Sequence, residues 1–205
     1  MRNSSASIRS LTIAMLVLTL GSSACHSDDS TDDSVHADSP ATQPATDQPT
    51  ITGAQTFTDR AAGFSLQYPA DWRKTEDKEY VLAIEPAGIK PTDPRRRITV
   101  DVPSLPPHLP GMITLGRVKS GFIKGQKKKL TDVNVIEDVD QPVPGAKASR
   151  VVLTGKLDGR DRKMAALLMM RDDRVYIIRA DSDLANYPQT KAAWDQMVAS
   201  LRWVK

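Results

Sequence analysis

The 205-residue sequence contains one cysteine, three histidines and few aromatic residues, which make up 5% of the chain. Because Cys25 is alone, no disulfide can form within the chain. His108 is the sole histidine after residue 36, so the C-terminal three quarters of the sequence lacks the ligands of a zinc site. Walker A, dinucleotide-binding and nucleophile-elbow motifs are also absent from the sequence.

A long hydrophobic run is missing as well. The apolar stretch at residues 11–20 has ten residues, which is about half of what a membrane-spanning helix needs. Arg2 and Arg9 precede this stretch, and the small residues 21–24 follow it. This order is typical of a secretory signal, so we expect residues 1–24 to be a signal peptide that directs export.

Cys25 follows this leader directly. The segment resembles a bacterial lipoprotein signal, in which such a cysteine is acylated and becomes the mature N-terminus. That pattern has Leu three residues before the cysteine, where this chain has Ser22. The alternative is ordinary cleavage after Ala24. We favour lipidation of Cys25, which also explains the single thiol and holds the protein on the extracytoplasmic side of a membrane.

Charge is unevenly distributed along the chain. Residues 26–50 contain six Asp and no Lys or Arg, whereas residues 51–205 carry 26 basic and 19 acidic side chains, a formal charge of +7. The acidic segment lacks aromatics and is rich in Ser, Thr and Pro, so it cannot bury enough apolar surface to fold. We therefore expect residues 25–55 to be a disordered acidic tether and residues 56–205 to form one folded domain.

The pattern within residues 56–205 indicates an α+β domain. Apolar residues alternate with polar ones in three strands, and residues 164–170 and 175–178 are apolar on both faces, as in central strands. Asp158-Gly159 predicts a two-residue hairpin turn, and Asp172-Asp173 is expected to turn the chain again into the next strand. Helices are expected at about residues 112–129 and around Trp194, Met197 and Leu201, with Pro188 in the first turn of the latter. We predict an antiparallel β-sheet flanked by helices. The three alternating strands are expected at residues 64–68, 80–85 and 98–102.

Seven basic residues form a candidate binding patch. A surface that binds anionic groups would use them, although an ordinary solvated face is the simpler interpretation. Nucleic acid is not an expected partner, because the protein is exported and no aromatic residues are interleaved with the cations. No catalytic, metal or cofactor site is predicted; Ser104 with His108, and Asp138 with Asp140, are weak candidates. The patch consists of Arg95, Arg96, Arg97, Lys124, Lys127, Lys128 and Lys129.

Several short motifs resemble the PsbP-like family. Residues 63–72 read Gly-Phe-Ser-Leu-Gln-Tyr-Pro-Ala-Asp-Trp, like the opening of that domain, and residues 200–203 read Ser-Leu-Arg-Trp, like its close. Residues 145–153 resemble the strand that enters the family's long hairpin. The resemblance implies an α/β/α sandwich, a fold shared by an extrinsic subunit of photosystem II and a nuclear-import factor that binds a small GTPase. It implies a non-enzymatic, partner-binding character and transfers no functional residue.

The sequence thus leads to three hypotheses. The first is an exported, lipid-anchored, non-catalytic binding or accessory protein of the bacterial cell envelope, with an unidentified protein or envelope partner and no cofactor. The second is a hydrolase-type enzyme with an unrecognised carboxylate and Arg site. The third is a purely structural envelope lipoprotein.

Overall fold

The computed structural model describes residues 53–90, 93, 95–105 and 113–205. The predicted signal peptide, Cys25, most of the tether and His108 lie outside these residues. Within them the chain forms ten strands and two helices, and every strand pairing is antiparallel. The expected α+β class, an antiparallel β-sheet flanked by helices, is therefore confirmed.

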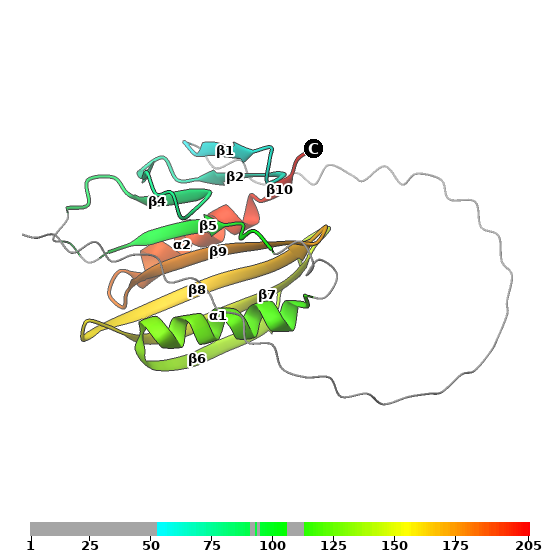
Figure 1. The fold of residues 1–205 in the computed structure, drawn as a ribbon. Coiled ribbons are helices and arrows are strands. Elements are labelled where there is room, and N and C mark those ends of the chain that lie inside the picture. The colour runs from blue at the N-terminus through cyan, green and yellow to red at the C-terminus, as the bar shows by residue number, and fades with distance from the viewer. Residues whose placement is uncertain (1–52, 91–92, 94, 106–112) are drawn as a thin grey trace, which may run out of the picture. The chain divides into compact units, whose positions relative to one another are not determined.

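Two sheets are present among the described residues, where the sequence predicted one (Figure 1). The larger sheet has the order β3-β4-β5-β9-β8-β7-β6, and the smaller has the order β1-β2-β10. The larger sheet comprises β3 (Trp72–Lys74), β4 (Leu82–Pro86), β5 (Arg97–Asp101), β6 (Thr131–Asp140), β7 (Lys147–Leu157), β8 (Arg160–Arg171) and β9 (Arg174–Asp183). The smaller comprises β1 (Gln55–Asp59), β2 (Phe64–Tyr68) and β10 (Arg202–Trp203).

Two tight turns build the meander of β7, β8 and β9. Asp158 and Gly159 have φ angles of +50° and +75°, and Asp172 and Asp173 have +48° and +57°. Two successive residues with positive φ form the turn whose twist matches a β-hairpin. Both predicted turns are therefore confirmed, and β8 and β9 lie in the interior of the sheet as their apolar sequences indicated.

The main core lies between the two sheets and helix α2 (Tyr187–Ala199). It combines Phe64 and Leu66 of β2 with Ile98 of β5 and Trp194 and Met197 of α2. The indole Nε1 of Trp194 donates a hydrogen bond of 3.0 Å to the carbonyl of Ile178, so the buried ring keeps its polar atom satisfied. Pro188 stands in the first turn of α2, as predicted.

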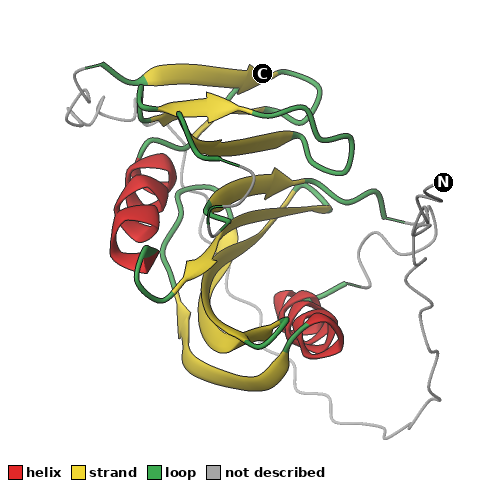
Figure 2. Ribbon diagram, turned by 90° about the vertical axis from the view of Figure 1, so that its left-hand side faces the viewer, coloured by secondary structure: helices red, strands yellow, loops and turns green. Residues whose placement is uncertain are grey.

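Helix α1 (Leu115–Lys129) covers the opposite face of the larger sheet (Figure 2). Thr114 caps it, with Oγ1 accepting a hydrogen bond of 3.3 Å from the backbone N–H of Arg117. Val118 and Phe122 pack with Val151 and Leu168, which confirms the predicted apolar stripe. The helix contacts β6, β7 and β8, and it does not cover the part of the same face that β3, β4 and β5 form.

Edge strand β6 was not predicted. Asp138 and Asp140 belong to this strand, where the sequence had suggested carboxylates near turns. Lys119 of α1 forms an ion pair of 2.7 Å with Asp138, which explains that carboxylate as a link between helix and sheet. Ile136 and Val139 of the same strand remain exposed.

Candidate binding surfaces

The structure separates the three arginines of the predicted basic patch. Arg95 is exposed, whereas Arg96 donates a hydrogen bond of 3.2 Å to Gln189 of α2. Arg97 is 8% exposed and forms an ion pair of 2.6 Å with Asp77. Arg96, just before β5, therefore reaches toward α2, whereas the side chain of Arg97 in β5 is directed toward Asp77. Arg95 is thus the arginine of this triplet with a freely exposed side chain.

The four lysines of the patch lie together at the end of α1. Lys124, Lys127, Lys128 and Lys129 are all exposed and form no ion pair with any described residue. The helix carries six cationic side chains and no acidic one. Three of its lysines fall in the last turn, where positive charge interacts favourably with the negative end of the helix dipole.

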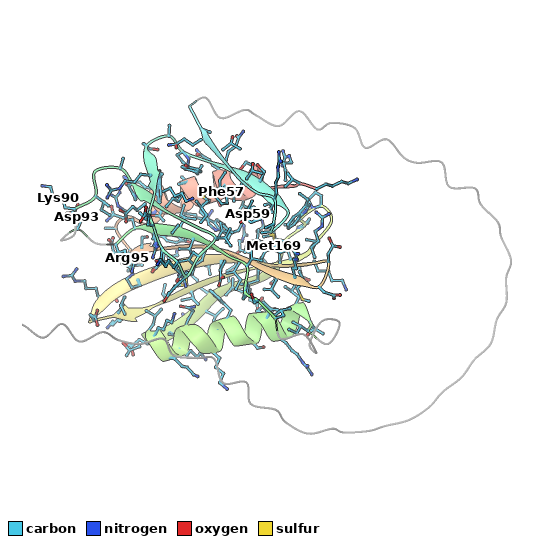
Figure 3. All side chains as sticks on the ribbon, turned by 45° about the horizontal axis from the view of Figure 1, so that its top comes forward. Phe57, Asp59, Lys90, Asp93, Arg95 and Met169 are labelled. Carbon is cyan, nitrogen blue, oxygen red and sulfur yellow. The ribbon has the colours of Figure 1, made fainter. Side chains whose placement is uncertain are left out.

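The two groups of cations do not form one patch. Arg95 lies beside the loop of Lys90 and Asp93, away from α1 (Figure 3). Strand β5, which begins at Arg97, is separated by β9 from the strands that α1 contacts. Neighbouring strands lie about 4.8 Å apart, so the centre of the α1 contact on β7 is about 14 Å from β5 along the sheet. The structure therefore yields a lysine surface on α1 and a separate Arg95 corner.

A second polar surface lies on the part of this sheet face that α1 does not cover. The Tyr80 ring contacts two guanidinium groups, with its centroid 5.1 Å from Cζ of Arg97 and 5.6 Å from Cζ of Arg179. Nη2 of Arg179 also donates a hydrogen bond of 3.0 Å to the Tyr80 hydroxyl. Tyr80 and Asp77 thus cover the side chains of β5 and β9, and cation–π contacts stabilise the arrangement.

Two carboxylates in this region have pKa values shifted in opposite directions. The backbone N–H of Glu79 and then the guanidinium of Arg97 lower the pKa of Asp77 below its ordinary value. Burial raises the pKa of Asp101, against the opposing effect of nearby Arg179. A partly buried carboxylate with a raised pKa beside an Arg is a feature of many functional sites. Sequence reasoning missed Asp101, because it looked like the solvent-facing residue of an alternating strand.

A small cavity of about 250 Å³ opens at the end of β7 and β8. Two acidic and two basic side chains line it, so its charges balance. Arg162 is 6% exposed and is held by Asp181, with 2.8 Å between Nη2 and Oδ1. No group of three His, Cys, Asp or Glu side chains within the described ranges is arranged to hold a metal ion. The lining residues are Asp132, Thr154, Gly155, Lys156, Asp161, Arg162 and Leu184.

Comparison with protein families identifies the fold. The profile of the family described as PsbP-like protein matches residues 11–202, which is most of the chain. The chain belongs to the PsbP-like family. No curated protein matches it in sequence. Among the parts of this PsbP-like chain that the structure describes, no helix is long and apolar enough to cross a membrane.

Three solved structures share the PsbP-like fold at low identity. Cyanobacterial PsbP (CyanoP) from Synechocystis sp. PCC 6803 is 13% identical, with a TM-score of 0.57, 75% of this chain covered and 94% of the other. LpqN, described as involved in cell envelope biogenesis of Mycobacterium tuberculosis, is 16% identical, with a TM-score of 0.50 and coverages of 74% and 92%. The Saccharomyces cerevisiae Ran-binding protein Mog1p is 9% identical, with a TM-score of 0.50 and coverages of 74% and 96%.

The motifs that carry the PsbP-like resemblance serve packing. Tyr68 and Trp72 are buried in the main core. Trp203 packs edge-on against Tyr176 with ring centroids 5.0 Å apart, and its Nε1 donates a hydrogen bond of 2.8 Å to the carbonyl of Pro144. These positions therefore explain how the PsbP-like domain folds, and they leave the binding surface to residues outside the motifs.

Proposed function

We propose that the protein is an exported, lipid-anchored, non-catalytic binding or accessory module of the bacterial cell envelope. The observation that carries the proposal is the PsbP-like family match over residues 11–202. By analogy, relatives of this fold include a Ran-binding protein and a protein involved in cell envelope biogenesis. The leader at residues 1–24 supports export, and Cys25 directly after it supports acylation.

The exposed cations are the binding surface that this function would use. The seven-residue patch expected from the sequence is divided by the fold, so we assign contact with anionic groups to Lys124, Lys127, Lys128 and Lys129. Arg95 and Arg96 form a separate corner. Arg97 serves the protein's own structure through its ion pair with Asp77. An accessory module needs an accessible surface of this kind rather than a deep cavity with convergent reactive groups.

Substitution of Cys25 tests the anchor. In cells that produce the full chain, Cys25→Ala should move the protein from the membrane fraction to the soluble exported fraction and abolish incorporation of labelled fatty acid. Ser22→Ala is the matched control, since it changes the leader and keeps the thiol, and it should remain in the membrane fraction. Unchanged membrane retention of the Cys25→Ala protein would refute the anchor. Recovery of an uncleaved chain from the cytosol would refute export itself.

A photocrosslinker tests the accessory role. Placed at exposed Lys124, it should give a reproducible adduct in intact cells, whereas the same group at exposed Leu157 serves as the control for random collisions. Equal adducts from both positions, or none from either, would count against a specific partner at α1. An adduct to a membrane lipid or to one envelope component would support the role.

A further inference from the structure

We propose that the outer face of α1 docks on the anionic headgroups of a lipid bilayer, with Lys124, Lys127, Lys128 and Lys129 as the contacting groups. The inference rests on the proposed function, in which Cys25 holds the protein at a membrane. It adds an orientation: α1 faces the bilayer, and the smaller sheet lies away from the headgroups.

The outward face of α1 carries charge of one sign. Its outward side chains are cationic or small, and they include neither an acid nor a large apolar residue. An ordinary solvated helix pairs charges of opposite sign four residues apart. Helix α2 of the same domain does so, with 2.6 Å between Lys191 and Asp195. The α1 face departs from this pattern, because it concentrates one sign of charge. The outward residues are Gly116, Arg117, Ser120, Gly121, Lys124, Lys127, Lys128 and Lys129.

Three of the four acidic residues of the adjoining strand β6 are engaged in other ion pairs. On the adjoining strand β6, Asp138 pairs with Lys119, Glu137 with Arg150, and Asp132 with Lys156. The ion pairs of the described chain therefore leave the four lysines uncompensated. Their positive charge is available to an external anion, and an array of separated lysines suits many headgroups better than one small ligand.

The buried side of α1 defines how the helix meets the bilayer. Its apolar residues are already packed against the sheet, including Val118, Phe122 and Ile123. An amphipathic helix that inserts between lipids needs such a face exposed. Contact through α1 is therefore electrostatic and superficial. A Cβ added at exposed Gly121 would have no atom within 4 Å, so nothing in the described domain packs on the helix at this position.

The chain between the anchor and the domain is long enough for this orientation. Strand β1, which follows Gly53, and α1 lie on opposite sides of the domain (Figures 1 and 2). A domain of this size is about 40 Å across. The 28 Cα–Cα steps from Cys25 to Gly53 span up to about 90–100 Å when extended. The anchored protein can thus turn α1 toward the bilayer. The six Asp residues of the segment between Cys25 and the domain are repelled by the same anionic headgroups.

Vesicle binding tests the proposal on the mature chain, residues 25–205, carrying Cys25→Ala so that acyl chains do not dominate. Vesicles of phosphatidylcholine alone are compared with vesicles containing one quarter phosphatidylglycerol. We expect the protein to partition at least tenfold more strongly onto the anionic vesicles at 50 mM salt, since each lysine near such a surface contributes roughly fivefold. The preference should vanish at 0.5 M salt.

Two charge-matched variants separate a defined face from net charge. The α1 variant replaces its four lysines by Gln, and the control replaces four other exposed cations by Gln. We expect the α1 variant to lose the preference for phosphatidylglycerol and the control to retain most of it. Lys128→Glu alone should weaken binding, and circular dichroism melting verifies that each variant is folded. The control positions are Lys78, Lys90, Lys147 and Arg160.

Equal losses in the two variants would overturn the proposal, as would a wild-type chain indifferent to phosphatidylglycerol. Binding to polyglutamate without a preference for anionic vesicles would also overturn it, in favour of an acidic polymer as partner. None of these three results bears on the lipid anchor at Cys25. If Cys25→Ala still releases the protein from cell membranes, the proposed function stands while the α1 contact fails.

Discussion

Tyr176 and Tyr187 are both buried in the main core but differ in their hydroxyl groups. The Tyr176 hydroxyl donates a hydrogen bond of 2.9 Å to the carbonyl of Ala62. The Tyr187 hydroxyl has no hydrogen-bond partner among the described residues. Burial, followed by the nearby charges of Asp195 and Glu137, raises the pKa of Tyr187 to about 12. The two side chains therefore contribute differently to stability although they are the same residue type.

Removal of each hydroxyl tests this difference. Tyr176→Phe should lower the free energy of unfolding by about 1–2 kcal/mol, because the buried Ala62 carbonyl loses its donor. Tyr187→Phe should leave it unchanged or raise it, because the hydroxyl is desolvated without compensation. Urea denaturation measures both values. An equal loss in the two variants would show that the Tyr187 hydroxyl is satisfied in solution.

Asp77 and Asp101 predict opposite pH dependence. The lowered pKa of Asp77 stabilises the fold above the ordinary value of 3.8, and this contribution is lost as the pH falls through the folded-state pKa. The raised pKa of Asp101 acts in the opposite direction, since its contribution is full below 3.8 and is lost as the pH rises through the folded-state pKa. Replacement by Asn should therefore destabilise at position 77 and be neutral or stabilising at position 101 at pH 7.

Thermal unfolding of both Asn variants between pH 3 and pH 7 measures these contributions. As the pH rises, the melting temperature of Asp77→Asn should fall relative to that of wild type. The melting temperature of Asp101→Asn should rise relative to that of wild type. Parallel curves for the two variants would contradict the assigned shifts. Arg73→Gln serves as a control for a general charge effect, because its ion pair with Glu85 involves an exposed guanidinium and should contribute little.

At the scale of elements, local chemistry explains the parts that the sequence predicted. The turns at residues 158–159 and 172–173 need two positive φ angles, which Asp and Gly tolerate. The apolar periodicity of α1 and α2 likewise depends on near neighbours. Strand β6 escaped prediction because its apolar residues are not confined to alternate positions: Val133 and Val135 face α1, whereas Ile136 and Val139 are exposed. Its pairing with β7 is also irregular, with register shifts after Thr131 and Val135.

Glycines in two elements give a matched test of packing. A Cβ at exposed Gly121 of α1 would have no atom within 4 Å, so Gly121→Ala should raise the unfolding free energy by about 0.5–1 kcal/mol through helix propensity. At Gly155 of β7 a Cβ would lie 3.1 Å from both Leu130 Cβ and the Thr131 carbonyl oxygen. Gly155→Ala should cost about 1–3 kcal/mol. Differential melting curves measure both, and a stabilised Gly155→Ala protein would contradict the close approach.

At the scale of the whole molecule, an Asp-rich sequence at residues 26–50 precedes the folded part that the structure describes. All described strands and both helices lie in the unit from Thr46 to Lys205. Helix α2 contacts strands of both sheets in that unit. At its C-terminal end, the hydroxyl of Ser200 accepts a hydrogen bond of 2.8 Å from the backbone N–H of Gln67 in β2. The domain should therefore hold its stability without the acidic segment.

Deletion of residues 27–52 tests this independence. We expect the mature chain and the deleted chain to unfold at the same temperature within about 1 °C, because the deleted sequence has too little apolar surface to pack. Calorimetry at two salt concentrations provides the measurement and its control, since a contact between the Asp-rich segment and α1 would depend on salt. A large drop in melting temperature on deletion would show that the segment packs on the domain.

The sequence by itself determined the features that depend on neighbouring residues: the hairpin turns, the periodic helices and the short PsbP-like motifs. The tertiary structure alone decided which polar residues meet. Arg97 and Arg179 both contact Tyr80 because β5 pairs with β9, about 80 positions along the chain. The same pairing buries Arg97 and leaves Arg95 exposed. Such contacts are set by long-range register, which the spacing of residues along one strand does not specify.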